Sequence, residues 1–246
     1  MPAFFISSTE IHGTELTLTG ELCHHLRASL RVKPGEILQL TDEYRQRYQA
    51  RVSTVTPQAL TAEILASRPG PTDAAPCVLL AQVILKGDHM DWVVQKASEL
   101  GVRTILPLTS RHGIVRPQPD RVAAQVARWQ RIATEAAQQS EQWQPPQVLE
   151  PMEVRRLFSS HGATAALLLA ERQDALGLAV APLPTHPTDT ITLMIGPEGG
   201  WAEEELSLAK EGRCRAVSLG ESILRADTAA VAALSIVFQA AVDVVT

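Results

Sequence analysis

The sequence predicts a two-part α/β protein, with a small β-rich N-terminal domain followed by a larger domain built on a mainly parallel sheet. Two features of the chain carry this prediction. Up to about residue 72, short apolar runs alternate with period two, which is typical of half-buried strands. From Cys77 onward, strand-length apolar runs alternate with helical patterns. The length of 246 residues and the hydrophobic content of 45% fit a globular chain with a proper core.

The N-terminal domain is expected to form a small barrel, because its short strands are closely spaced and separated by turn residues. A helical piece at residues 24–32 interrupts the strands, and the segment 67–73, rich in proline and glycine, is interpreted as a linker. We therefore predict two domains, residues 1–73 and 74–246. The strands of the first domain are predicted at residues 15–19, 36–40 and 49–55.

The larger domain alternates strand and helix along its length. One helix is expected to begin at Asp88, which can cap it, and to stop at Gly101. A long amphipathic helix follows at residues 120–139, and the last helix, residues 228–242, is apolar on every face. The strands of this domain are predicted at residues 78–85, 102–108, 163–170, 191–195 and 216–219.

The stretch 191–225 has the composition of a ligand-binding edge. Its apolar run ends abruptly at Gly196-Pro197, three glycines surround Glu198, and three successive glutamates then suit the positive end of a helix. A second strand runs into Gly220. Loops at the ends of neighbouring strands are where an open α/β sheet binds its ligand. The spacing alone also fits a tight turn that binds nothing, because neither G-x-G-x-x-G nor a P-loop pattern is present.

The formal net charge of the chain is −5, so its overall charge does not favour binding to nucleic acid. Any surface that binds nucleic acid must therefore be a local basic patch. Two basic groups in the first domain contain no acid within them. They fit either phosphate contacts, which position RNA, or ordinary solvated surface. The groups are Arg27, Arg31 and Lys33, and Arg45, Arg47 and Arg51.

The three cysteines are far apart, which argues against a disulfide framework and against a zinc site, and no other metal site is expected. The N-terminus lacks the basic and apolar regions of a signal peptide. The most apolar stretch, 229–242, is too short to span a membrane. We therefore expect a soluble, cytoplasmic protein.

Two motifs in the last third of the chain identify a family. GPEGG at residues 196–200, followed by the acidic helix start and then by LGESILRADTA at 219–229, resembles the signature of the ribosomal RNA small subunit methyltransferase E family, which belongs to the SPOUT superfamily. KGDHMD and QKASELGV at residues 86–91 and 95–102, and HHLRASLRVKPGE at 24–36, extend the resemblance over nearly the whole chain.

The chain departs from the family pattern at three places. Arg111-His112 follows Ser110 where the family has S-E-R, Gln142 stands where an arginine is expected, and Asp227 replaces a glutamate. Losing fixed cations near the site would weaken anion binding, which Arg111, His112 or Arg116 could compensate.

The resemblance implies a trefoil-knotted α/β domain with its cofactor loops at about residues 191–230, a PUA-like RNA-binding barrel at the N-terminus, and a homodimer. It implies S-adenosylmethionine as methyl donor and N3 of a uridine in 16S ribosomal RNA, free or in the 30S particle, as acceptor. The cofactor residues it implies are Leu193, Ile195, Gly196, Glu198, Gly199, Gly200, Leu219, Gly220, Ile223, Leu224 and Thr228. The RNA-binding residues are Arg27, Arg31, Lys33, Lys86 and Arg116.

Catalysis by such a protein is mainly a matter of aligning the methyl group, the sulfur and the acceptor nitrogen. Methylation at N3 builds up an imide anion, which a fixed cation would stabilise. Arg225 is the first candidate for that cation, although it could instead be a structural arginine that pairs with Glu198 or Asp227. The sequence does not identify a general base. Glu198 and Asp227 could each serve, but neither has a spacing that demands the role. Glu99 has either a role at the site or a simple helical pair with Arg103.

Two other functions also fit parts of the sequence. The first is a catalytically weak or inactive RNA-binding factor that assists ribosome assembly, which the departures at Arg111-His112 and Gln142 favour. The second is a phosphate- or nucleotide-binding enzyme, against which stands the absence of the lysine and hydroxyl that bind phosphates and magnesium.

Overall fold

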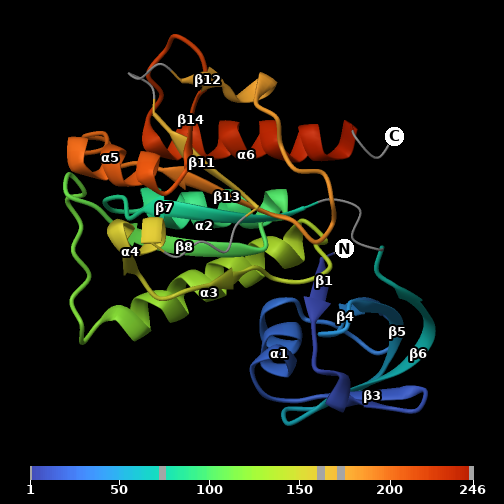
Figure 1. Cartoon of the computed structure of the whole chain (residues 1–246). Coiled ribbons are helices and arrows are strands. Elements are labelled where there is room, and N and C mark those ends of the chain that lie inside the picture. Colours follow the sequence, from blue (N-terminus) through green and yellow to red (C-terminus); the bar gives the residue numbers. More distant parts are fainter. Residues whose placement is uncertain (1, 72–75, 160–163, 171–174, 244–246) are drawn as a thin grey trace. The chain divides into compact units, whose positions relative to one another are not determined.

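The computed structural model describes residues 2–71, 76–159, 164–170 and 175–243 (Figure 1). Residues 241–243 are described by their backbone alone. The chain divides into two compact units, Met1–Thr72 with Ala137–Pro145, and Asp73–Ala136 with Pro146–Thr246. The predicted boundary between residues 73 and 74 lies outside the described residues.

The first unit contains a sheet whose described strands run in the order β1-β4-β5-β6-β3-β2. β1 is parallel to β4, and the other neighbours are antiparallel. The predicted helical piece is divided into α1 (Gly20–His24) and a π-helical turn, η2 (His25–Ser29). The other elements are β1 (Ala3–Phe5), η1 (Ser8–Glu10), β2 (Ile11–His12), β3 (Glu15–Leu18), β4 (Ile37–Thr41), β5 (Gln46–Val55) and β6 (Leu60–Pro69).

The prediction of a linker from residue 67 is wrong for its first three residues, which lie in β6. Ser67 pairs with Tyr48, and Pro69 pairs with Gln46, the first residue of β5. Pairing with β5 outweighs the local composition here. Proline is tolerated because β3 pairs only with residues 60–63 of β6, so that β6 has a single neighbour at Pro69.

One arginine of the second basic group lies inside the first unit. The Arg47 side chain is 5% exposed, and its Nη2 donates to the carbonyl oxygens of Glu141 and Gln142, both at 2.9 Å. Its guanidinium lies 3.9 Å from the centre of the Trp143 ring. Burial and the nearby charge of Arg68 lower the pKa of Arg47. The hypothesis that Arg47 contacts phosphate is therefore wrong, because the side chain holds segment 137–145 against β5.

The second unit is built on a parallel sheet whose described strands run in the order β10-β8-β7-β13-β11-β14-β12, with β9 paired to β8. Every described pair in this sheet is parallel, as predicted. The strands are β7 (Cys77–Val83), β8 (Thr104–Thr109), β9 (Gln147–Val148), β10 (Met152–Glu153), β11 (Ala165–Leu169), β12 (Leu176–Gly177), β13 (Thr190–Ile195) and β14 (Arg215–Ser218).

Helices cover both faces of this sheet (Figure 1). Alternate residues of each strand enter two separate cores, so that Leu80 packs with α2 (His89–Leu100), α3 (Val122–Gln139) and α6 (Ala226–Asp243), while its neighbour Ala81 packs with α4 (Val154–Ser159) and α5 (Glu203–Glu211). A short 3-10 helix, η3 (Leu178–Val180), also joins the first core. No helix in the described part of the chain is long and apolar enough to cross a membrane.

The strand order brings the functional loops together. β13 lies between β7 and β11, and β14 follows β11. Because these strands are parallel, their carboxyl ends share one edge of the sheet, so the segments after β11, β13 and β14 meet there although they are far apart in the sequence.

Replacing Arg47 by alanine should lower the free energy of unfolding by roughly 2–3 kcal/mol, because two backbone carbonyls lose a charged donor and Trp143 loses its stacking partner. Chemical denaturation of the full chain measures this. The matched control is Arg51→Ala, an exposed arginine of the same strand, which should change stability by no more than about 0.5 kcal/mol. Equal effects of the two substitutions would contradict a structural role for Arg47.

Candidate functional site

A cavity of about 610 Å³ opens at the carboxyl edge of the parallel sheet. This volume is in the range of small-ligand sites, which commonly measure about 300–1,000 Å³. The walls combine apolar side chains with the backbone of a glycine-rich loop. The lining residues are Leu169, Ala170, Ile195, Gly196, Pro197, Glu198, Gly199, Gly200, Trp201, Glu203, Leu206, Ile223, Leu224, Arg225, Ala226 and Ala229.

Trp201 fixes the loop that follows β13. Its Nε1 donates to the carbonyl oxygen of Leu169, at the end of β11, at 2.8 Å. A Cβ on Gly196 would lie only 3.0 Å from the indole ring. Gly196 is therefore required by the close approach of Trp201.

The glycines of the two loops serve different purposes. Gly200 and Gly220 have φ of +72° and +123°, which side chains rarely adopt. Gly196 and Gly199 do not have positive φ, and a Cβ on Gly199 would lie 3.2 Å from the Cβ of His112. Positive φ thus explains Gly200 and Gly220, whereas crowding explains Gly196 and Gly199.

Most of the residues that the family resemblance assigned to the cofactor line this cavity. Those in its wall are Ile195, Gly196, Glu198, Gly199, Gly200, Ile223 and Leu224. Four others lie outside the wall. Leu193 is fully buried inside β13, Leu219 packs against the core, and Gly220 and Thr228 flank the second loop and the start of α6.

Sequence reasoning missed several lining residues, because they belong to other elements. Leu169 is the last residue of β11 and Ala170 follows it, while Leu206 lies on α5 and Ala229 on α6. The end of β11 could have been found, since the strand adjacent to a ligand-binding strand ends at the same edge of the sheet.

Arg225 lines the cavity and is exposed. Among the described residues, no ion pair joins it to Glu198 or Asp227, the two partners that a structural role would require. Asp227 instead bonds to Nδ1 of His89 at the start of α2, with 2.7 Å between the atoms. The guanidinium is therefore available to a ligand.

The Asp227 carboxylate fixes the start of α6. Its Oδ1 accepts a hydrogen bond of 2.7 Å from the Thr228 amide, and its Oδ2 contacts His89. Partial burial raises the pKa of Asp227, but the hydrogen bonds to His89 and Thr228 outweigh burial, so the pKa lies below its ordinary value. Two such bonds stabilise the charged form of the carboxylate. Asp227 is therefore better placed to hold α6 against α2 than to act as a base.

The family departures at Arg111 and His112 lie beside the cavity. The amide of Arg111 donates to Oε1 of Glu205 at 2.7 Å, and the amide of Ala202 donates to Oε2 of the same carboxylate at 3.0 Å. His112 Nδ1 lies 3.2 Å from the carbonyl oxygen of Gly200. The loop after β8 is thus joined to both the glycine-rich loop and the start of α5.

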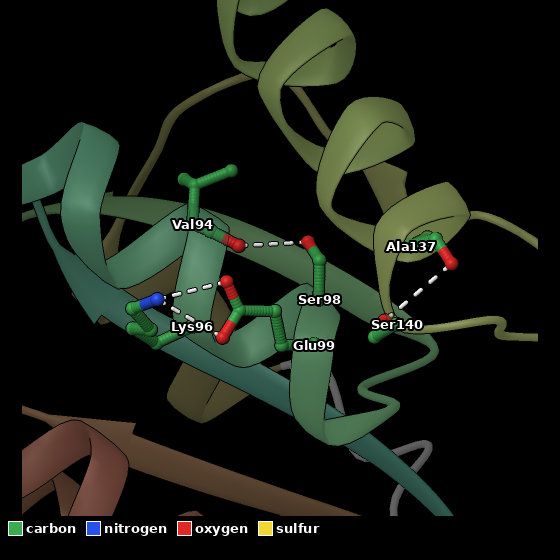
Figure 2. Close-up of polar contacts among 6 residues, drawn as sticks. All are labelled: Val94, Lys96, Ser98, Glu99, Ala137 and Ser140. Atoms are coloured by element: carbon green, nitrogen blue, oxygen red, sulfur yellow. Dashed lines mark hydrogen bonds and ion pairs between the residues drawn. The ribbon is translucent and has the colours of Figure 1, made fainter. Parts of the chain in front are cut away.

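Glu99 and Lys96 form a pair on α2, with Nζ donating to Oε1 at 2.8 Å and to Oε2 at 3.0 Å (Figure 2). Between them in the sequence, Ser98 Oγ donates to the carbonyl oxygen of Val94. Just after α3, Ser140 Oγ donates to the carbonyl oxygen of Ala137. Neither Glu99 nor Lys96 lines the cavity. Lys96 and Glu99 thus form a local pair one helical turn apart on α2.

The residues predicted to contact RNA fall into two places. Arg31 and Lys33 are exposed after η2 in the first unit, together with the half-buried Arg27. Lys86, after β7, and Arg116, after β8, are exposed in the second unit. Nη2 of Arg116 donates to the carbonyl oxygens of Ser110 and Arg111, which fixes its direction. Among the described residues, no group of three His, Cys, Asp or Glu side chains is placed to hold a metal ion.

Comparison with known families defines the class of this protein. A family model described as an RNA methyltransferase domain matches residues 73–238, and one described as an RNA methyltransferase PUA domain matches residues 18–65. The α/β domain with a parallel sheet and the PUA domain predicted from the sequence are thereby confirmed.

Individual relatives narrow the class. The chain is 31% identical to ribosomal RNA small subunit methyltransferase E of Synechocystis, covering 94% of this chain and 75% of that one. A crystal structure of that enzyme from Neisseria gonorrhoeae, bound to S-adenosylmethionine, is 34% identical, with a TM-score of 0.84 over 96% of this chain and 95% of that chain. A Legionella pneumophila methyltransferase in complex with the same cofactor is 28% identical, with a TM-score of 0.87 over 97% of each chain. The chain belongs to the ribosomal RNA small subunit methyltransferase E family.

Replacing Asp227 by asparagine should destabilise the chain by roughly 1 kcal/mol at neutral pH. Because the folded-state pKa is lowered, the carboxylate stabilises the fold fully above its unfolded pKa of about 4, and this contribution is lost as the pH falls through the folded-state pKa. The stability gap between the wild type and Asp227→Asn should therefore narrow below pH ~4.

Thermal unfolding measured from pH 7 down to acid values tests this expectation. Asp88→Asn is the control, because Asp88 is exposed at the start of α2 and its side chain makes no capping hydrogen bond. A gap that stays constant or widens in acid would contradict the stabilising role of the Asp227 carboxylate.

Proposed function

We propose that this protein transfers the methyl group of S-adenosylmethionine to N3 of a uridine in 16S ribosomal RNA. The observation that carries the proposal is the cavity between the 196–201 loop and the 223–226 segment, in a chain whose fold extends over nearly the full length of relatives crystallised with this cofactor.

The residues of the cavity fit the cofactor. The backbone of 196–200 offers amides and carbonyls to the polar parts of a nucleoside, and Gly200 leaves open space on its Cα. The apolar side chains of Ile195, Ile223 and Leu224 can hold the flat adenine ring. Ile223 is 62% exposed in this structure, as expected of a side chain that a ligand would cover. S-adenosylmethionine, when bound, supplies a methyl group already activated by its sulfonium.

The residues of this chain would then orient the two substrates and stabilise the charge that develops during the transfer. Holding the acceptor nitrogen in line with the methyl group removes most of the entropic cost of the encounter. Arg225 would stabilise the negative charge that develops on the uracil imide, because its guanidinium faces the cavity without an acidic partner among the described residues. Glu198 lines the same cavity and is our candidate for receiving the N3 proton.

The RNA partner would be held by positive charge in both units. Arg31 and Lys33 in the first unit and Lys86 in the second are exposed and can contact phosphates, which position RNA without reading its sequence. The proposed substrate, 16S RNA or the 30S particle, places the protein in the cytoplasm.

We further propose a homodimer formed through α6. One face of this helix is buried in the core, yet Val231, Ile236 and Phe238 are only partly covered within one chain. Apolar side chains on a helix need cover from water, and a second copy of the chain would supply it next to the cavity, where α6 begins.

A methylation assay tests the proposed function. The purified chain, labelled S-adenosylmethionine and 30S particles from a strain lacking this activity should give RNA with one added methyl group, located at a uridine N3 by mass analysis. Cofactor binding without any transfer would favour the alternative of a non-catalytic RNA-binding factor.

Replacing Arg225 by alanine should lower kcat by roughly 10²-fold, as the loss of one oxyanion-stabilising group does, while the affinity for S-adenosylmethionine changes little. Arg225→Lys, which keeps the charge, should retain part of the activity. Steady-state kinetics with a separate cofactor titration distinguish the two effects. An equal loss of turnover and cofactor affinity would make Arg225 a structural residue.

Light scattering of the full chain at micromolar concentration should give twice the mass of one chain, because the partly covered face of α6 would be buried between two copies. Replacing Ile236 by aspartate should shift the mass toward that of one chain. A single-chain mass for the wild type would rule out the proposed dimer under these conditions.

A further inference from the structure

A second hollow lies in the parallel-sheet unit, at the start of α5, which also borders the cofactor cavity. Its volume is about 300 Å³, and it is formed by the ends of β8 and β10, the loop after β8, and the starts of α4 and α5. Three arginines line it together with two glutamates. The charged lining residues are Arg111, Arg116, Arg155, Glu153 and Glu205.

Arg116 is held in a fixed direction at this hollow. Its Nη2 donates to the carbonyl oxygen of Ser110 at 2.7 Å and to that of Arg111 at 3.3 Å. Neither bond uses Nε or Nη1, and no acceptor in the described part of the chain bonds to them, so these donors are available to a ligand. Because the guanidinium already has one orientation, little conformational entropy is lost when it binds a planar or tetrahedral anion.

The other two arginines are exposed. Arg111 contacts Glu204 across 3.8 Å, with both side chains more than half exposed, so this pair costs little to open. Arg155 projects from α4, and among the described residues its side chain makes no hydrogen bond or ion pair. A phosphate could therefore recruit both guanidiniums without breaking a buried contact.

The acids of the hollow oppose this charge only in part. Glu205 is 2% exposed, and its two oxygens already accept the amides of Arg111 and Ala202. These two hydrogen bonds from backbone amides thus compensate much of the negative charge of Glu205. Glu153 is exposed to solvent, where its effect is screened.

The hollow and the cofactor cavity are lined by neighbouring residues of α5. Glu205 lines the hollow, while Glu203 and Leu206 on the same turn of α5 line the cavity. The loop that carries Arg111 and Arg116 also contacts the glycine-rich loop through His112 and Gly200, at 3.2 Å. An anion in the hollow would therefore lie next to a nucleotide presented to the cavity.

We propose that Arg111, Arg116 and Arg155 form a binding site for a phosphodiester group of the substrate RNA adjacent to the methylated nucleotide. The inference rests on the proposed function, since it assigns a substrate contact to that reaction. Arginine forks match phosphate oxygens in pairs, and a phosphate fixed here would set the position of the neighbouring base against the cofactor.

The test compares Arg155→Gln with Arg156→Gln, two exposed arginines that are consecutive on α4, of which only Arg155 lines the hollow. With saturating S-adenosylmethionine, Arg155→Gln should raise KM for small-subunit RNA roughly tenfold, as for one lost charged hydrogen bond, with kcat nearly unchanged. The slope of log affinity against log salt should become less negative by about 0.7, the loss of one contact to a single strand. Arg156→Gln should match the wild type in all three quantities.

Each alternative outcome is decisive. If Arg155→Gln behaves like Arg156→Gln while the wild type methylates RNA, the site in the hollow is overturned and the proposed function stands. If the wild type binds S-adenosylmethionine but neither binds nor methylates RNA, the proposed function itself fails and the inference fails with it. If calorimetry with inorganic phosphate gives micromolar binding that Arg155→Gln removes, the hollow is a site for a free anion, and the assignment to RNA is overturned.

Discussion

The hydrogen bond between Trp201 and the Leu169 carbonyl is the contact on which the candidate site depends. It joins the loop after β13 to the end of β11, and the indole fills the space that a side chain on Gly196 would need. With the loop fixed, α5 begins where the Glu205 carboxylate can accept the amides of Ala202 and Arg111. A short chain of contacts therefore shapes both the cavity and the arginine-lined hollow, which are lined by neighbouring residues of the first turn of α5.

Much of this arrangement could be predicted from the sequence, because the signals are local. The apolar run 191–195, the glycines after it and the acidic helix start identify a strand, a loop and a helix in order, and the structure has all three. The parallel sheet followed from the alternation of strands and helices. The order of strands in space did not follow, and that order is what brings Leu169 and Ala170 to the cavity.

Charged residues were harder to interpret, because a charge has the same local pattern whether it faces solvent, a partner or a ligand. Arg47 belongs to a basic group in the sequence, yet it is buried against Trp143, which lies almost a hundred residues away. Glu99 pairs with Lys96 on its own helix. Arg155 had no motif to distinguish it, and only the folded chain places it beside Arg111 and Arg116. Long-range contacts decide such cases, and a single sequence does not contain them.

Calorimetric titration of the full chain with S-adenosylmethionine tests most directly the claim that the cavity at the sheet edge is the cofactor site. ATP serves as the comparison ligand. Ile223→Asp, which places a charge in the cavity wall, is matched by Val180→Asp, another exposed apolar residue that lies outside the wall. We expect one S-adenosylmethionine per chain, no ATP binding, a large loss of affinity in Ile223→Asp and none in Val180→Asp. Unchanged affinity in Ile223→Asp, or binding of ATP as tight as that of S-adenosylmethionine, would contradict the claim.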